Sequence, residues 1–416
     1  MSQSSSCFLE TADRIGCRLC RDALWDGPRC NWLGWSRELI NRAVGPVYRS
    51  FGPELYEGVA GIALFLGRLY PYTKDPLQKK TLEGAIQHVS DRIVHGDDST
   101  NMGFYTGWSG MAYALIEVGR ILENDALIDR GITALGGLED AQEDGRMVGV
   151  MDGCAGVIPA LIDIAQRFHR EELIGVAVQY GTDIVDQAAK SDAGWSWETL
   201  SIPEGRHLTG YAHGVAGIAC ALLELHRVTG EERFREAAME GLRYERGAFC
   251  AAQGNWPDFR KAAEFDSPLN PICTMAWCHG APGIGISRLR MLRLMEEDDK
   301  LLNEVDVAIH STVAALQDPV LPGRGNYSLC HGSGGNCELL MLAADQMSRL
   351  DLRRKAEQVG LHGVEQFERQ NRPWPCGVEG AGETPALMLG SAGIGYYYLR
   401  LHDPDAVPSV LIIMPQ

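Results

Sequence analysis

Two short segments of the chain, residues 278–280 and 330–332, both read Cys-His-Gly, and both precede a run of small and apolar residues. Thiolate and imidazole groups are ligands that zinc prefers in proteins. Matching local context suggests that the two segments build one metal site from distant parts of the chain. Cys278, Cys330 and His331 are therefore the predicted zinc ligands.

A set of three protein ligands leaves one coordination position for solvent or substrate, which is typical of catalytic zinc. Two anionic sulfurs would neutralise the charge of the ion, so it would polarise carbonyl groups poorly. Such an ion is better suited to holding a substrate thiol as a thiolate near pH 7. We therefore expect thiol activation rather than hydrolysis. His279 is an alternative fourth ligand, which would close the site.

Seven Gly-x-x-Gly units punctuate the chain, with 46 to 66 residues between their first glycines. Each interval has room for two helices and their loops. The apolar segments after the glycines suit buried helices, and the more polar segments between them suit outer helices. We predict an all-α fold, an α/α toroid of about seven inner and seven outer helices around a central cavity. The units begin at Gly58, Gly107, Gly153, Gly214, Gly280, Gly332 and Gly390.

The residue before the first glycine of a unit often has a titratable or metal-binding side chain. Three of the 11 histidines of the chain occupy this position. If the units are equivalent, these side chains converge at one end of the toroid. There the glycines would let helix starts crowd together and expose backbone N–H groups. The seven residues are Glu57, Thr106, Asp152, His213, His279, His331 and Leu389.

His213 lies at this position without a cysteine beside it. A lone histidine is usually a hydrogen-bonded structural residue. The position that His213 shares with the proposed ligands favours proton transfer instead, because imidazole, with an ordinary pKa near 6.5, both takes and gives protons at neutral pH.

Composition narrows the class of protein. The formal net charge of −17 and a pI of about 5.1 argue against nucleic-acid binding. No apolar run reaches the ~18 residues of a transmembrane helix, and the first residues lack the features of a signal peptide. We therefore expect a cytoplasmic enzyme whose 12 cysteines do not form a disulfide framework.

The N-terminal segment carries four of these cysteines, Cys7, Cys17, Cys20 and Cys30. They could form a small zinc knuckle, but helical periodicity in this stretch favours a helix that covers the edge of the toroid. We predict an N-terminal helical segment over residues 1–50 that packs on a toroid domain over residues 51–416.

Five stretches of the chain resemble the lanthionine cyclase family, the LanC-like proteins, and most closely the cyclase half of the class II (LanM) synthetases. The resemblance implies an α/α toroid with a central zinc. Enzymes of this family add a peptide cysteine thiolate to dehydroalanine or dehydrobutyrine, which closes the thioether rings of ribosomal peptide natural products. The stretches are GYAHGVAGIACALLEL, YERGAFCAAQGNWPDFRKA, AWCHGAPGIGISRLRML, NYSLCHGSGGNCELL and LMLGSAGIGYYYLRLHDPDAVPSVL.

The resemblance also implies roles for individual residues and for partners. Cys278, Cys330 and His331 would bind zinc, and His213 would be the acid/base histidine. A dehydrated precursor peptide would be the substrate. Nothing in the chain resembles a phosphate-binding loop, so we expect a separate dehydratase partner.

Two positions depart from the family pattern. Many members carry an acid/base aspartate where this chain has Gly149, and some carry an arginine where it has Thr274. Asp152 could substitute for the missing aspartate, or it could be a helix N-cap or first-turn carboxylate. The group that stabilises an enolate is either missing or supplied elsewhere.

Two alternatives therefore stay open beside the peptide cyclase. One is a zinc enzyme that adds a small thiol such as glutathione to dehydroamino acids. The other is a non-catalytic subunit that binds a peptide as a scaffold. Other toroid enzymes fit less well, because glycosidases need a pair of carboxylates and prenyltransferases lack the paired Cys-His-Gly segments.

Overall fold

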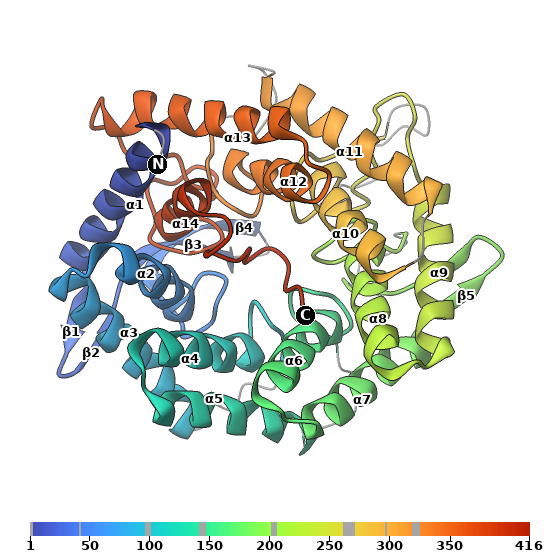
Figure 1. Ribbon diagram of the computed structural model, residues 1–416, viewed down its shortest axis with the longest axis horizontal. Coiled ribbons are helices and arrows are strands. Elements are labelled where there is room, and N and C mark those ends of the chain that lie inside the picture. Colours follow the sequence, from blue (N-terminus) through green and yellow to red (C-terminus); the bar gives the residue numbers. More distant parts are fainter. Residues whose placement is uncertain are drawn as a thin grey trace.

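The chain folds into two concentric rings of helices in a computed structural model (Figure 1), which describes residues 3–40, 43–95, 101–140, 147–200, 206–260, 271–295, 298–317 and 325–416. This arrangement confirms the predicted α/α toroid. The inner helices are α2 (Val59–Thr73), α4 (Trp108–Leu122), α6 (Cys154–Phe168), α8 (Val215–Thr229), α10 (Ala281–Leu294), α12 (Ser333–Gln346) and α14 (Ser391–His402). The outer helices are α3 (Pro76–His95), α5 (Asp125–Gly136), α7 (Glu172–Asp186), α9 (Glu232–Gly247), α11 (Asp299–Gln317), α13 (Leu350–Gly363) and α1 (Gln3–Asp22).

The N-terminal helix α1 takes the outer place beside the last inner helix, α14 (Figure 1). Inner helices are apolar on nearly all sides because they are covered on nearly all sides, whereas outer helices bury one face. An ion pair of 2.6 Å between Arg18 and Glu368 ties α1 to the short π-helix η2 (Val364–Glu368) after α13. The first and last helices of the described chain are thus joined side by side.

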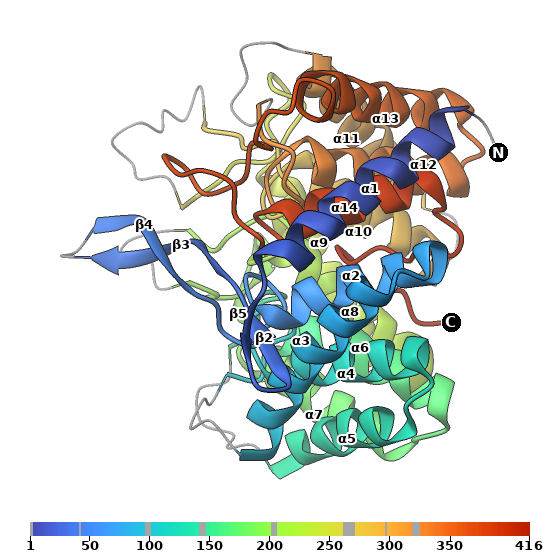
Figure 2. The same cartoon turned by 90° about the vertical axis from the view of Figure 1, so that its left-hand side faces the viewer.

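The helical character expected for residues 1–50 holds for α1 but is wrong for residues 24–50. Strands β1 (Leu24–Asp26) and β2 (Arg29–Asn31) form one hairpin, and β3 (Leu33–Ile40) and β4 (Ala43–Ser50) form another. Gly27, at φ +58°, supplies the left-handed residue that the first tight turn requires. The β3–β4 ribbon projects from one face of the toroid (Figure 2). A third hairpin joins β5 (Ala189–Ser191) to β6 (Gly194–Ser196). The division of the chain at residue 50 stays a prediction.

The Gly-x-x-Gly units close tight loops at the starts of the inner helices. In every unit, a Cβ added to the second glycine would lie 1.7 to 2.2 Å from the carbonyl oxygen six residues earlier. At Gly217 this oxygen belongs to Tyr211. The expected exposure of backbone N–H groups was wrong, because loop carbonyls accept them; Cys154 N–H, for example, donates to Met147 O at 2.9 Å.

A closed circle of seven backbone hydrogen bonds, which we call the amide ring, joins these seven loops. Each bond runs between residues that lie two positions before a first glycine. The seven units are therefore structurally equivalent, and the residues that follow the ring positions converge at one end of the toroid. The N–H to O distances are Cys278 to Cys330 3.4 Å, Cys330 to Met388 2.9 Å, Met388 to Tyr56 2.9 Å, Tyr56 to Tyr105 2.8 Å, Tyr105 to Met151 3.1 Å, Met151 to Ala212 3.0 Å and Ala212 to Cys278 3.2 Å.

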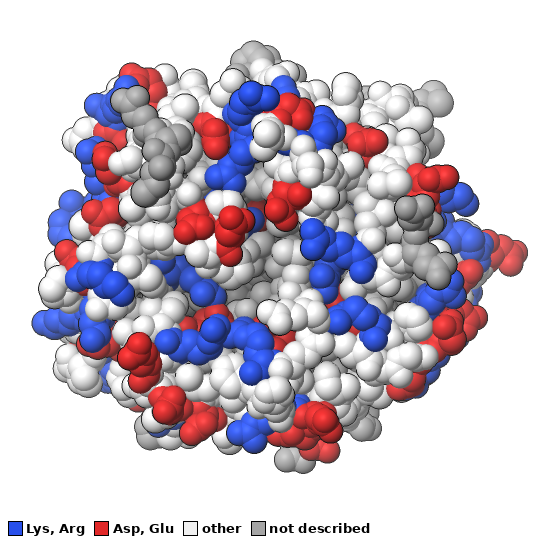
Figure 3. All heavy atoms as spheres, viewed as in Figure 1, with Lys and Arg blue, Asp and Glu red and all other residues white. Residues whose placement is uncertain are grey.

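Charged residues recur farther along the inner helices, ten positions after the first glycine in six of the seven units. They form ion pairs that join neighbouring inner helices, because charges removed from water need partners. Figure 3 shows basic and acidic side chains around the hollow at the centre of the face opposite the β3–β4 ribbon. The pairs are Arg68–Glu117, Arg167–Glu117, Arg290–Glu224 and Arg400–Glu338.

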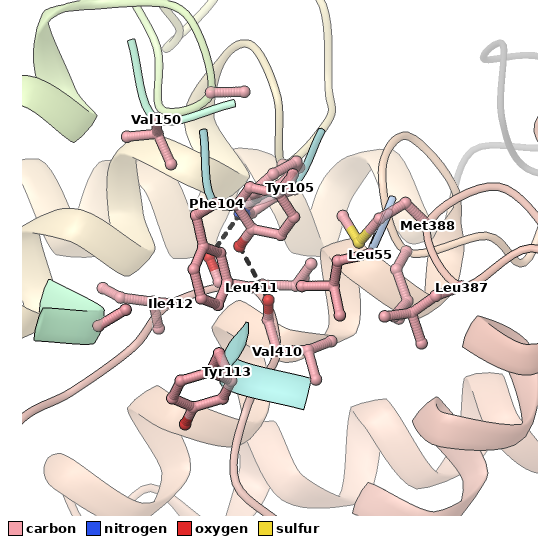
Figure 4. Close-up of a cluster of buried hydrophobic side chains, with 14 of the residues drawn as sticks. Leu55, Phe104, Tyr105, Tyr113, Val150, Leu387, Met388, Val410, Leu411 and Ile412 are labelled. Atoms are coloured by element: carbon pink, nitrogen blue, oxygen red, sulfur yellow. Dashed lines mark hydrogen bonds between the residues drawn. The ribbon is translucent and has the colours of Figure 1, made fainter. Parts of the chain in front are cut away.

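The expected central cavity is filled on this side of the amide ring. Residues 403–416 run from α14 into the centre of the toroid (Figure 1). Tyr105 Oη donates to Val410 O at 2.8 Å and Trp277 Nε1 donates to Leu411 O at 2.9 Å. Figure 4 shows Val410, Leu411 and Ile412 packed against apolar side chains, including Tyr105, from the loops of the amide ring. The described residues therefore cover the amide ring on the side opposite the ribbon.

Candidate active site

The amide ring places Cys278 and Cys330 at adjacent positions. Their buried thiols are within hydrogen-bonding distance of each other. This contact lowers the pKa of Cys278, and together with burial it raises the pKa of Cys330 well above its ordinary value. Tyr56, also on the ring, makes a further side-chain hydrogen bond to Cys330. The pair can therefore carry one shared negative charge before any cation binds.

His331 follows Cys330 and lies close to Gly377. Its Nε2 is 2.8 Å from Gly377 O, and since a carbonyl can only accept, Nε2 carries the hydrogen. The lone pair of Nδ1 is then available, which is the arrangement usual for a metal-binding histidine. In the described ranges, no three His, Cys, Asp or Glu side chains surround a common point. Two thiols and an imidazole at neighbouring ring positions nevertheless match the donor types that zinc prefers, and the three-ligand set stays a prediction.

His213 and His279 stack on each other, with ring centroids 5.9 Å apart and planes 18° apart. The ring of His279 is 1% exposed and lies near Asp258, with Nδ1 3.9 Å from Oδ1. Burial and the charge of Arg260 lower the pKa of His213 to about 4 and that of His279 to about 3. Both rings are therefore neutral at pH 7, and the expected pKa of 6.5 for His213 is corrected.

Asp152 is next to His213 in the order of units around the amide ring. A Cβ added at Gly149 would lie 3.3 Å from Asp152 Oδ1 and 3.8 Å from the Cα of His213. The Asp152 carboxylate therefore lies where a side chain at position 149 would begin. The alternative of a helix cap is wrong, because α6 is capped by Gly153 without a side-chain hydrogen bond and has no acidic residue in its first turn.

Oδ1 of Asp152 is buried and has no hydrogen-bond partner in the part of the chain that the structure describes. Burial raises the pKa of this carboxyl group. A carboxyl group of raised pKa is better able to hold a proton near neutral pH, as acid/base work requires. Asp152, His213, His279 and His331 thus occupy four consecutive places around the ring.

Two further site residues, Asp258 and Arg260, were missed by the sequence analysis. Arg260 Nε and Nη2 donate to the two oxygens of Asp258 at 2.9 and 2.8 Å, and Thr274 Oγ1 donates to Oδ2 at 2.9 Å. Burial opposes ionisation of Asp258, but these hydrogen bonds hold its pKa well below the usual range. Asp-x-Arg spacing permits such a two-bond pair. That spacing was the available signal, but it lies outside the glycine units on which the analysis relied.

Comparison with known proteins agrees with this arrangement. Residues 50–412 match the family model described as lanthionine synthetase C-like protein. The chain belongs to this family. Family membership agrees with the resemblance seen in the sequence and accounts for the seven units and the paired Cys-His-Gly segments.

Several relatives of known role are similar to the chain over much of its length. The lacticin 481/lactococcin biosynthesis protein LcnDR2 of Lactococcus lactis subsp. lactis is 24% identical over 85% of this chain. The chain spans only 36% of the length of that relative. The glutathione S-transferase LANCL1 of Danio rerio is 24% identical over 68% of this chain and 67% of its own length. The nisin biosynthesis protein NisC of Lactococcus lactis is 22% identical over 69% of this chain and 73% of its own length.

Among solved structures, nisin cyclase shares the fold, with a TM-score of 0.61 over 86% of this chain and 91% of its own. At 18% identity this likeness supports the toroid alone. No described helix of our chain has both the length and the apolar character needed to span a membrane.

Proposed function

We propose that the protein is a zinc-dependent peptide cyclase, which adds cysteine thiolates of a dehydrated precursor peptide to dehydroalanine or dehydrobutyrine. The products would be lanthionine and methyllanthionine thioether rings. One observation carries the proposal: on the amide ring the loop of His213 is followed directly by the loop of Cys278 and then by that of Cys330. Relatives named for the biosynthesis of lacticin and of nisin support it.

Cys278, Cys330 and His331 would hold the metal. Bound zinc would lower the pKa of a substrate thiol so that it reacts as a thiolate. Because the amide ring brings the proposed zinc ligands and His213 to one end of the toroid, the reacting groups of a flexible peptide would be held together in one place. Holding both groups in one geometry is a large source of rate enhancement.

His213 would move the proton. As a neutral imidazole it takes the proton from the substrate thiol, and the sulfur lone pair then forms the bond to the β-carbon. The π electrons of the carbon–carbon double bond move to the α-carbon and its amide carbonyl. The imidazolium of His213 returns the proton to the α-carbon, so the product has the same mass as the substrate.

Asp152 would replace the family aspartate that is absent at Gly149. Its Oδ1 and the Cα of His213 both lie within 4 Å of the place where a Cβ at position 149 would be, and this buried oxygen is free to accept a hydrogen bond. We assign it to acid/base work together with His213. A dehydratase supplied by a separate protein, or by further sequence as in a longer relative, would provide the dehydrated peptide.

The experiment is a ring-closure assay with a dehydrated, cysteine-containing peptide and purified protein. Because cyclisation leaves the mass unchanged, free thiols are counted by alkylation followed by mass spectrometry. We expect the wild type to consume the thiols, and His213→Asn to retain its metal but leave the thiols free. A wild-type protein that carries its metal and leaves every thiol free would overturn the proposal.

Addition of a small thiol is the second candidate, favoured by the similarity to a protein named glutathione S-transferase. The same peptide, with its cysteines replaced by serine and with glutathione added, separates the two functions. Efficient formation of glutathione adducts with poor ring closure would favour this candidate. A scaffold without catalysis is less well supported, because a carboxylate, that of Asp152, lies close to Gly149, the position of the missing family aspartate.

A further inference from the structure

Arg260 is the basic side chain that pairs with the carboxylate beside the stacked imidazoles of the candidate site. Asp258 Oδ1 is 3.9 Å from Nδ1 of His279, and His279 stacks on His213. The side chain of Arg260 is 36% exposed, whereas the side chain of Asp258 is fully buried. The arginine side chain is therefore partly accessible at the site.

Asp258 holds Arg260 by one edge of the guanidinium group. Nε and one hydrogen of Nη2 are occupied by the two carboxylate oxygens. Thr274 Oγ1 and the backbone bond from Asp258 N–H to Ile272 O, at 2.8 Å, fix the carboxylate in turn. Nη1 has no hydrogen-bond partner in the described ranges. A guanidinium has five N–H donors, so three remain for a ligand.

The ion pair leaves donors of the guanidinium group unused. The two oxygens of the fully buried Asp258 accept from one edge of Arg260, so the three remaining N–H groups belong to a side chain that is partly exposed. Preorganised donors of this kind stabilise negative charge that develops during a reaction. A purely structural ion pair with both partners fully paired would leave no donors for this purpose.

We propose that Arg260 is a catalytic residue that donates a hydrogen bond from Nη1 to the amide carbonyl oxygen of the dehydro residue. This inference rests on the proposed function. Asp258 and Thr274 are positioning residues that aim the guanidinium group. This arrangement places a cation in the site although position 274 holds threonine, because the threonine hydroxyl orients the carboxylate that holds the arginine.

The step is balanced without any further reactant. The sulfur lone pair forms the bond to the β-carbon, and the π electrons of the double bond move through the α-carbon to the carbonyl oxygen. Arg260 stabilises this enolate by hydrogen bonding and remains protonated throughout. The electron pair then returns to the α-carbon, which takes the proton that left the thiol.

The test compares Arg260→Gln and Arg260→Lys with a matched control, Arg206→Gln. Arg206 is exposed and lies over the ring of Phe259, 5.1 Å from its centroid, so it is a neighbouring arginine outside the site. We expect Arg260→Gln to lower kcat for ring closure by about 100-fold with KM changed less than threefold, as for the loss of an oxyanion donor. Arg260→Lys should recover part of kcat, and the control should match the wild type. Metal content should be unchanged in all three, whereas Arg260→Gln, which leaves the buried Asp258 carboxylate without its cation, should melt at a lower temperature than the wild type.

A second measurement separates the catalytic role from a structural one. In D₂O, the enzyme should exchange the α-proton of the thioether product, because the reverse reaction passes through the same enolate. Arg260→Gln should slow this exchange as much as it slows ring closure, and Thr274→Val should slow both by a smaller factor.

The outcomes separate this inference from the proposed function. A wild type that closes rings while Arg260→Gln has a kcat within threefold of it would overturn the role of Arg260 alone. A metal-loaded wild type that closes no rings would overturn both. If Arg260→Gln does not fold, the test uses Arg260→Lys and Thr274→Val instead. Wild-type values of kcat and of the α-proton exchange rate in both variants would overturn the catalytic role of Arg260.

Discussion

The backbone N–H of Cys278 donates to the carbonyl oxygen of Cys330, although the two cysteines are 52 residues apart in the chain. The main chain sets the separation of the two cysteine backbones, and the χ1 rotamers then set the separation of the thiols. A ligand pair built in this way is anchored at the starts of two helices. This gives the proposed metal site a rigid base.

The first prediction concerns the metal. Cys330→Ala should reduce zinc from about one ion per chain to almost none, because two remaining ligands hold zinc poorly. Cys220→Ala, which removes a buried thiol inside α8, is the matched control and should keep the metal. Elemental analysis of the purified proteins measures this. Equal zinc in the two variants would exclude the predicted ligand set.

The second prediction concerns the loops of the amide ring. Gly217→Ala should lower stability, since the new Cβ would lie 2.1 Å from Tyr211 O and the loop would have to move. Gly175→Ala, near the start of α7 with open space around the new Cβ, should instead raise stability by about 0.5–1 kcal/mol. Thermal unfolding of both variants compares them. A Gly217→Ala protein as stable as the wild type would show that the close loop is not required.

The third prediction concerns the carboxylate beside His213. Asp152→Ala should slow ring closure about 100-fold or more, which is within the usual contribution of a general acid or base. Adding Gly149→Asp to that variant should restore part of the rate, because the new side chain would begin 3.3 Å from the position of the lost oxygen. Steady-state assays measure both. An unchanged rate in Asp152→Ala would remove Asp152 from the mechanism.

The fourth prediction concerns the ion pairs of the inner helices and their dependence on pH. Burial alone would raise the pKa of Glu117, but Arg68 and Arg167 outweigh it and hold this pKa below 4.5. The pair therefore stabilises the fold fully above pH ~4.5, and the contribution is lost as pH falls through the lowered pKa. Glu117→Gln should cost about 3 kcal/mol at pH 7 and progressively less below pH 4.

Chemical unfolding of Glu117→Gln and wild type between pH 3 and 7 tests this dependence. Glu365→Gln breaks an exposed pair with Arg369 and is the control, with an expected change below about 0.5 kcal/mol. A difference between Glu117→Gln and wild type that grows toward acid pH would contradict the assigned sign.

The fold and the adjacent positions of Cys278 and Cys330 could be predicted because the units repeat. Gly-x-x-Gly units and the residue before each one recur in register, so their equivalence is visible without a structure. The charged residues ten positions after the first glycine recur too, but they were overlooked because they interrupt otherwise apolar helices. Residues 24–50 have no counterpart in the other units, and their hairpins could not be inferred from the repeat.

Asp258 and Arg260 were missed for a different physical reason. They lie between two units, and their place in the site depends on a contact with Thr274, sixteen residues beyond Asp258. The pKa of His213 was also out of reach, because it depends on burial and on the charge of Arg260 rather than on residue type. Position within a repeat is readable from sequence, whereas the electrostatic surroundings of that position are not.

The C-terminal segment that fills the toroid axis affects how a substrate peptide could reach the site. Val410 and Leu411 are bound to Tyr105 and Trp277 behind the amide ring, so the part of the chain that the structure describes leaves a polypeptide no route along the axis. On the proposed function, a peptide would not pass through the toroid. It would enter the site from one face and leave by the same face. A peptide with several cysteines would then need a fresh docking event for each ring, which allows the rings to be closed in any order.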